Sequence, residues 1–152
     1  MSVITSQQTA RYFEQFSTTD VTFTREVIKA TLLYPKQIFI KCVGYQWPCI
    51  LFSSSMTSAK IITNVQNSFK QIVARANNVV SLRYSFIQRD KPDPVSFFVN
   101  ARILDYSPYT AENPDLNFLN VAFTNRPPDE LIQRLGALLE ANSDAQNRRE
   151  ER

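Results

Sequence analysis

Apolar and polar residues alternate along the middle of the chain, which is the pattern of half-buried β-strands. The alternation is clearest in "NVVSLRYSFIQRD", where one predicted face carries four apolar residues: Val80, Leu82, Tyr84 and Phe86. The segments "VSFFVNARILDY" and "LNFLNVAF" follow after the polar turns "DKPDP" and "TAENPD". Each is therefore predicted to pair with the strand before it in an antiparallel sheet.

The same period of two begins earlier, at Lys36. It predicts one strand in "KQIFIKC", a turn at 44–46 and a second strand in "WPCILF", where Pro48 indicates a sheet edge or a strand start. After the hydroxyl-rich loop "SSSMTS", the segment "AKIIT" is a further short strand. The pattern therefore predicts about six strands separated by turns.

Helical spacing appears at both ends of the chain. Residues 5–17 predict a short, weakly amphipathic helix, and a second one starts at Thr24 as N-cap and ends before Pro35. After Pro127-Pro128, a last helix carries a leucine stripe: Leu131, Leu135, Leu138 and Leu139. The segment "NSFKQIVARANN" fits a helix, with a strand through "KQIVA" as the alternative.

These elements predict a mainly β fold, a six-stranded antiparallel barrel with two short N-terminal helices and one C-terminal helix. The leucine stripe is expected to plug the barrel, because four leucines are too few for a coiled coil. We divide the chain into an N-terminal helical extension (1–35), the barrel with its helix (36–142) and a polar, charged linker (143–152).

Composition removes several classes of function. The chain of 152 residues has no histidine, which excludes serine–histidine and cysteine–histidine catalysis, and its two glycines cannot form a glycine-rich phosphate loop. Four carboxylates stand at turns or helix starts without forming a motif, so no catalytic residue is predicted: Glu26, Asp93, Asp105 and Asp129. No metal site or cofactor is expected either.

The N-terminal segment lacks the features of a signal peptide, and no apolar run is long enough to span a membrane. We therefore expect a cytoplasmic protein without membrane insertion. In that compartment Cys42 and Cys49 are expected to be reduced, buried and inert.

The order of these segments resembles the PilZ domain family. The likeness covers residues 36–140 and is carried by "WPCILFSSSMTSAKII", "VVSLRYSF", "VSFFVNARILDY" and "LNFLNVAFTNRPPDELIQRLGALL". The upstream segments "DVTFTREVIKA" and "PKQIFIKC" look like the N-terminal domain of two-domain PilZ proteins of spirochaetes. The resemblance implies a PilZ-like split barrel in a non-enzymatic receptor of cyclic di-GMP.

In PilZ domains an Arg-x-x-x-Arg pair before the barrel and an Asp/Asn-x-Ser-x-x-Gly motif hold the ligand. Guanidinium forks suit phosphate oxygens and guanine faces. This chain departs from the motif: Ser55 stands at its serine, but Ser53 replaces Asp/Asn and Ser58 replaces glycine. The segment before Lys36 has Arg25 alone, so the resemblance implies a degenerate barrel without its own ligand site.

An arginine pair appears instead at the other end, as Arg148-x-x-x-Arg152 in "NRREER". The resemblance implies that these arginines open a following PilZ domain and bind cyclic di-GMP there. A second register remains open, in which Arg149 starts the pair. We expect the following domain and cyclic di-GMP to be the partners, with the downstream target undefined.

An alternative is a small β-barrel that binds nucleic acid or another protein. Exposed aromatic and basic residues would form the single-strand surface: Phe39, Tyr45, Arg83 and Arg102. The formal net charge of +3 is spread along the chain rather than clustered, which favours the structural interpretation of these residues.

Overall fold

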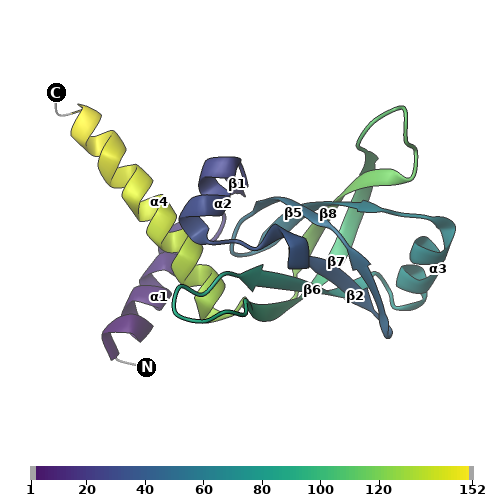
Figure 1. Cartoon of the computed structure of the whole chain (residues 1–152), viewed down its shortest axis with the longest axis horizontal. Coiled ribbons are helices and arrows are strands. Elements are labelled where there is room, and N and C mark those ends of the chain that lie inside the picture. Colours follow the sequence, from purple (N-terminus) through teal and green to yellow (C-terminus); the bar gives the residue numbers. More distant parts are fainter. Residues whose placement is uncertain (1–2, 151–152) are drawn as a thin grey trace.

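A computed structural model describes residues 3–150, with the side chains of residues 3–5, 67 and 144–150 left out. One antiparallel sheet of eight strands forms the centre of the molecule, in the order β1-β4-β5-β8-β7-β6-β2-β3. Its strands are β1 (Val21–Thr22), β2 (Phe39–Cys42), β3 (Tyr45–Pro48), β4 (Ile50–Ser54), β5 (Ser58–Asn64), β6 (Val79–Phe86), β7 (Val95–Pro108) and β8 (Leu116–Phe123). Figure 1 shows that this sheet is strongly curled.

The curl depends on the passage from β3 to β4. Cys49 alone separates the two strands, yet β3 pairs with β2 at one end of the strand order while β4 pairs with β5 near the other. The Cys49 amide still donates to the Ile38 carbonyl at 3.0 Å, which extends the β2–β3 pairing to this residue. The sheet therefore curls back on itself at Cys49.

The prediction of six strands was wrong on two counts, and both have a physical reason. The run "WPCILF" divides into two strands because Pro48 has no amide hydrogen for the ladder and the chain changes partners after it. The two-residue strand β1 is too short to show any period, and it pairs Val21 with Ser54. The segment 1–35 thus contributes a strand to the sheet as well as helices.

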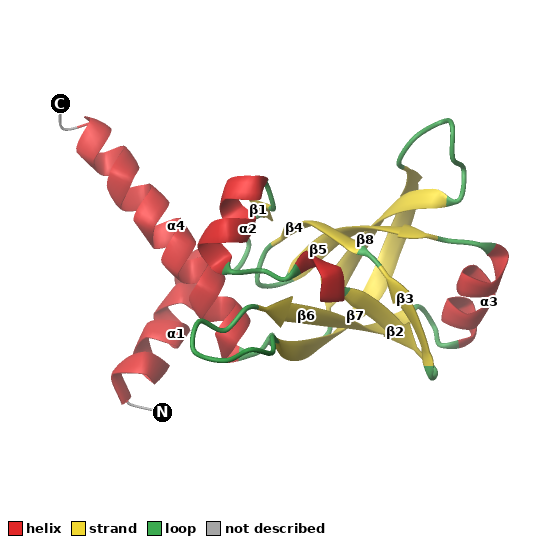
Figure 2. Cartoon of the chain, in the orientation of Figure 1, coloured by secondary structure: helices red, strands yellow, loops and turns green. Residues whose placement is uncertain are grey.

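Helices cover the two ends of the curled sheet (Figure 2). At one end α3 (Asn67–Arg75) buries Phe69, whose ring meets the Trp47 ring edge-on at 4.7 Å. This helix was not counted in the predicted fold, and the strand alternative through "KQIVA" was wrong. At the other end lie α1 (Val3–Phe16), α2 (Arg25–Thr31) and α4 (Asp129–Glu150), with the short 3₁₀ helix η1 (Pro35–Gln37) following α2. The described part of the chain therefore has four α-helices, where three were predicted.

The alternating strands bury the face that the sequence indicates. Val80, Leu82, Tyr84 and Phe86 are all buried, and from α4 the core receives Leu131, Ile132 and Leu135. Leu131 and Leu135 of the predicted leucine stripe thus pack into the core, while Leu138 and Leu139 are only partly buried. The helix continues past the predicted boundary at residue 142 and reaches Glu150.

Arg134 joins α4 to both α2 and the sheet. Its Nε donates to the Glu130 carboxylate at 2.7 Å, while its Nη1 donates to the Thr31 carbonyl at the C-terminal end of α2, also at 2.7 Å. The guanidinium lies 4.6 Å from the centre of the Phe86 ring. Thr24 caps the other end of α2 as predicted, since its Oγ1 accepts from the Val27 amide. Together these contacts hold α2 in place against α4.

The crossing of α1 and α4 depends on a glycine. A β-carbon on Gly136 would overlap ring atoms of Tyr12 and would come within 2.7 Å of the Tyr12 β-carbon. Tyr12 is 3% exposed, and its inner atoms lie too near the backbone for a change of rotamer to relieve such a contact. The two helices can therefore approach this closely only because residue 136 has no side chain.

This geometry predicts that Gly136→Ala destabilises the protein. Alanine normally stabilises a helix interior by about 1 kcal/mol relative to glycine, but the overlap with Tyr12 should cost about 1–3 kcal/mol. Urea unfolding followed by circular dichroism measures the net change. Asn142→Ala, at an exposed position of the same helix, is the control and should change stability by less than ~0.5 kcal/mol. A stabilised Gly136→Ala variant would contradict the close crossing.

Both cysteines are free and buried, as expected. Burial raises the pKa of the Cys49 thiol to about 12 and also raises the pKa of Cys42. A raised pKa means that the folded state favours the protonated thiol. Folding stability should therefore fall as the pH rises above the ordinary thiol pKa of ~8.5.

The same shift predicts slow thiol chemistry. At pH 8 the Cys49 thiolate fraction should be about a thousandfold lower in the folded protein than in denaturant. Labelling of a Cys42→Ala variant with Ellman's reagent, with and without guanidinium, measures this ratio for Cys49 alone. Rapid stoichiometric labelling of the native variant would show that Cys49 is accessible and ionised.

Candidate functional site: a depression beside the serine turn

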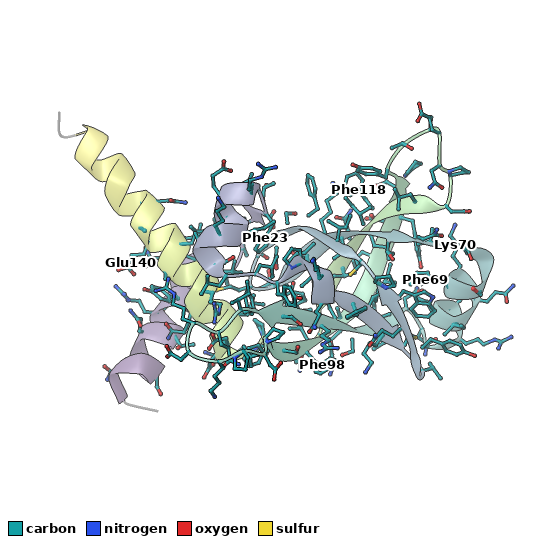
Figure 3. The ribbon with its side chains drawn as sticks, in the orientation of Figure 1. Phe23, Phe69, Lys70, Phe98, Phe118 and Glu140 are labelled. Atoms are coloured by element: carbon teal, nitrogen blue, oxygen red, sulfur yellow. The ribbon has the colours of Figure 1, made fainter. Side chains whose placement is uncertain are left out.

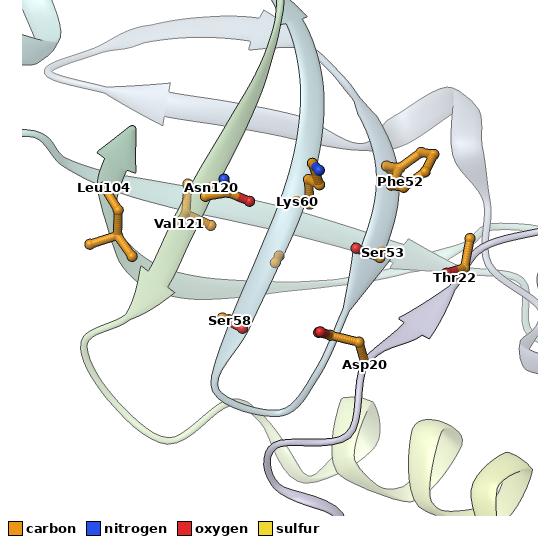
Figure 4. A pocket seen from close by; sticks show the side chains of 10 residues that line it. Asp20, Thr22, Phe52, Ser53, Ser58, Lys60, Leu104, Asn120 and Val121 are labelled. Carbon is orange, nitrogen blue, oxygen red and sulfur yellow. The ribbon is translucent and has the colours of Figure 1, made fainter. Parts of the chain in front are cut away.

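A depression of about 410 Å³ lies on the outer face of β4, β5 and β8, next to the β4–β5 turn (Figure 4). Ser58, Lys60 and Asn120 form its floor, because outward positions alternate along β5 and β8. Phe52 on β4 and Leu104 at the bulge of β7 stand on either side. The lining also includes Asp20, Thr22, Ser53, Ala59 and Val121. The depression is thus polar at its floor and apolar at its sides.

Two of the three serines that were singled out from the sequence line this depression, and the third organises the β4–β5 turn (residues 54–58), called the serine turn below. Ser53 and Ser58 line it, whereas Ser55 is 1% exposed. The Ser55 Oγ accepts from the amides of Thr57 and Ser58, each at 3.1 Å. Its hydroxyl is therefore used inside the turn, a common structural role of serine.

The turn is also fixed to the rest of the molecule. Ser54 is fully buried, and its hydroxyl lies 3.1 Å from the Tyr84 hydroxyl in the core. Burial raises the pKa of Tyr84, and its hydrogen bond with Ser54 opposes this shift. On the other side, the Met56 amide and the Thr57 hydroxyl both donate to the Ser17 carbonyl at 3.2 Å. The residues after α1 therefore hold the turn from outside while the core holds it from inside.

Lys60 supplies the positive charge on the floor of the depression. Its Nζ lies 4.6 Å from the centre of the Phe118 ring and 5.8 Å from that of Phe52. No salt bridge of Lys60 occurs within the described residues. Nearby, the Asn120 amide donates to the Asp105 carboxylate at 2.7 Å. The depression therefore offers one ammonium group, several hydroxyls and the Asp20 carboxylate, but no guanidinium.

The predicted arginine pair lies elsewhere. The backbone of Arg148 and Arg149 belongs to the last turns of α4, and Arg152 falls outside the described residues. Figure 1 shows the end of α4 projecting away from the curled sheet. The structure therefore does not bring the arginines and the serine turn together through any described side chain.

Three residues of the nucleic-acid alternative, Phe39, Arg83 and Arg102, lie on the outer face of the sheet, whereas Tyr45 is paired with the buried Cys42 and shares its face. Arg83 stacks on Phe39 with 5.6 Å between guanidinium and ring centre, and its Nη2 donates to Ser96. Lys41 lies 5.2 Å from the centre of the Phe98 ring on the same face. Tyr45 stacks on Trp47, and Arg102 lies opposite Val79 and Ala122 in the ladder. Phe39 and Arg83 are thus brought together, while Tyr45 and Arg102 belong to other pairs.

The four carboxylates considered for catalysis lie in separate elements. Glu26 stands in the first turn of α2, and the backbone oxygen of Asp93 accepts from Gln88 in a loop. Asp105 bonds to Asn120, and Asp129 lies 3.8 Å from Arg126. Across the described residues, no three side chains of the metal-binding types come together.

Sequence reasoning missed Lys60, Phe52, Phe118 and Asn120 as parts of a site. A usable signal was present, because the alternation in "LNFLNVAF" already places Phe118 and Asn120 on the same face. What the sequence could not show is that β5 lies between β4 and β8, which brings Lys60 against rings from two other strands.

In the described residues, no helix is long and apolar enough to cross a membrane.

Comparisons with known proteins give a curated relative and a solved structure of similar fold. The chain is 43% identical to a protein of Treponema denticola named cyclic di-GMP binding protein, over all 152 residues and 48% of that relative. The chain thus spans about half the length of the curated relative that it matches. Its fold is similar to the crystal structure of the PlzA protein of Borreliella burgdorferi in complex with c-di-GMP. The TM-score is 0.71 at 21% identity, and the match covers 93% of this chain and 58% of that one.

Neither of these relatives is named as an enzyme. The model of the PilZN3 domain matches residues 7–142, which include most of α1, the whole curled sheet and most of α4. The match therefore treats the N-terminal helices and the barrel as one unit. The chain belongs to the PilZN3 domain family.

Proposed function

We propose that this chain is a non-enzymatic regulatory module of a cyclic di-GMP effector. In this proposal it is the N-terminal, PilZ-like half of a protein whose second half is a ligand-binding PilZ domain. The observation that carries the proposal is the 43% identity over the whole chain to about half of a cyclic di-GMP binding protein. The depression supports the part of the proposal that puts the ligand site elsewhere, because its side chains match cyclic di-GMP poorly.

The depression is poorly suited to cyclic di-GMP on its own. The ligand carries two phosphodiester groups, and bidentate guanidinium groups are the side chains best matched to phosphate oxygens. Among the described residues, Lys60 is the only cation that lines the depression, and Asp20 adds a negative charge at its edge. The hydroxyl of Ser55, at the serine position of the ligand motif, is already hydrogen-bonded to backbone amides within the turn. We therefore regard Ser53, Ser55 and Ser58 as a degenerate ligand motif.

The proposed ligand contacts come from the C-terminal segment. Arg148 and Arg152, or Arg149 in the alternative register, would bind the phosphates on the surface of the second domain. α4 runs through residues 143–150 without a break, so most of the linker is helical. Ligand binding would then favour one orientation of the two domains, because the arginine contacts form only in that arrangement.

Calorimetry with cyclic di-GMP tests this proposal. Residues 1–152 alone should give no measurable binding, and the protein extended by its second domain should bind. In the extended protein Arg148→Ala should weaken binding about 10- to 100-fold, because it removes a charge-assisted hydrogen bond to phosphate. Arg149→Ala, measured separately, decides between the two registers.

Lys60→Ala is the matched control, since it removes a cation from the depression and should leave the affinity unchanged. Tight binding by residues 1–152, lost on Lys60→Ala, would overturn the proposal. It would show that the depression is itself the ligand site.

A second candidate function is the binding of single-stranded nucleic acid on the outer face of the sheet. The stacked pairs Arg83–Phe39 and Lys41–Phe98 favour it, because basic and aromatic side chains alternate there. Fluorescence anisotropy with a single-stranded oligonucleotide of about 16 nucleotides tests this function. Binding should fall steeply with salt and should weaken on Arg83→Ala. Salt-independent binding, or none, would remove this candidate.

A further inference from the structure

A second concave surface lies between α2 and α4, away from the serine turn. It is a groove of about 410 Å³ whose walls are made of small or apolar side chains. One wall has Ala30 near the end of α2 and Leu32 just after it, and the other has Ala137, Leu138 and Ala141 on α4. Ala30, Ala137 and Ala141 are exposed, so no side chain of the described residues covers them. Alanines on both helices leave room for another chain to approach closely.

The groove is held open by contacts beneath it. Arg134 lines its floor and bonds to Glu130 and to the Thr31 carbonyl, so the spacing of α2 and α4 is fixed at this point. The Thr31 hydroxyl donates to the Val27 carbonyl and is not available to a ligand. Arg134 is only 18% exposed, and its charge is already paired. The surface that remains for a partner is therefore largely apolar.

One positive charge at the edge of the groove has no acidic partner among the side chains that the structure describes. Arg89, in the β6–β7 loop, lines the groove and is exposed, and no salt bridge of its guanidinium occurs among the described residues. The neighbouring Ile87 is 46% exposed and donates its amide to the Leu32 carbonyl at 2.7 Å. Exposed Ile87 is thus attached to Leu32 at the edge of the groove, two residues before the Arg89 guanidinium. A complementary partner would present apolar side chains next to a carboxylate.

We propose that this groove is the docking surface for the second domain of the same protein. The inference rests on the proposed function, and it names the face through which the two domains make contact. The occupant would insert apolar side chains between α2 and α4 and place an aspartate or glutamate opposite Arg89.

The tether favours this occupant over an unrelated protein. α4 is both a wall of the groove and the element that leads into the linker, and only nine residues separate Ala141 from Glu150. At 1.5 Å per residue this helical stretch measures about 14 Å. A domain that follows α4 is attached to the helix that forms one wall of the groove, so the attachment itself keeps it near the groove and favours weak apolar contacts there.

Small-angle X-ray scattering of the two-domain protein, with and without saturating cyclic di-GMP, tests the inference. Ala137→Arg and Ala141→Arg should each increase the radius of gyration of the state that is compact in the wild type, because arginine fills the groove. Arg89→Glu should act in the same direction by repelling the partner carboxylate. Two arginine substitutions at exposed positions outside the groove, Asn142→Arg on α4 and Leu104→Arg on β7, are the controls and should leave the radius unchanged.

Calorimetry on the same variants separates the two levels of the proposal. If the wild-type two-domain protein does not bind cyclic di-GMP, the proposed function fails. If it binds but the groove variants scatter like the wild type, the docking surface is wrong and the proposed function stands. A change in the radius of gyration caused by Leu104→Arg alone would place the contact on the sheet face. Scattering that depends on protein concentration would indicate that a second copy of the protein occupies the groove. Either result overturns the inference. Circular dichroism of each variant of residues 1–152 confirms that the groove variants fold.

Discussion

The close crossing of α1 and α4 at Gly136 determines how the rest of the molecule is arranged. Because Tyr12 packs directly on the α4 backbone, α4 can bury Leu131, Ile132 and Leu135 in the end of the curled sheet. The same position of α4 lets Arg134 reach the end of α2 and the Phe86 ring. The residues that follow α1 then bring Ser17 to the serine turn. A single residue without a side chain therefore supports the helix pair, α2 and the turn together.

The two concave surfaces differ in what they can bind. The depression on the sheet combines an ammonium group, hydroxyls and a carboxylate with apolar sides, which is a mixed surface. The α2–α4 groove is mostly apolar and preorganised by buried contacts, which suits a protein segment better than a charged nucleotide. The two surfaces therefore suit different classes of partner.

The sequence predicted those parts of the fold that follow from local patterns. The long strands β6, β7 and β8, the Thr24 cap and the leucine stripe all follow from period, capping or proline, and all are present. The split at Cys49 and the strand β1 depend on which strands lie side by side, which the period of a single segment does not contain. The depression itself was not predicted, although two of its lining residues, Ser53 and Ser58, were singled out through the motif. Lys60 and its two phenylalanine rings come together only through the order of the strands.

The length of α4 gives the Gly136 crossing a mechanical meaning. From Gly136 to Glu150 the helix extends about 21 Å without proline or glycine, so it should behave as a stiff rod. A tilt of about 10° about the crossing would move its far end by roughly 4 Å, from the same length and rise per residue. Such a displacement exceeds the length of a hydrogen bond, so a small change in packing against Tyr12 would be enlarged along the helix into a shift that could break a polar contact. The α1–α4 crossing would then be the pivot about which the end of α4 moves relative to the sheet.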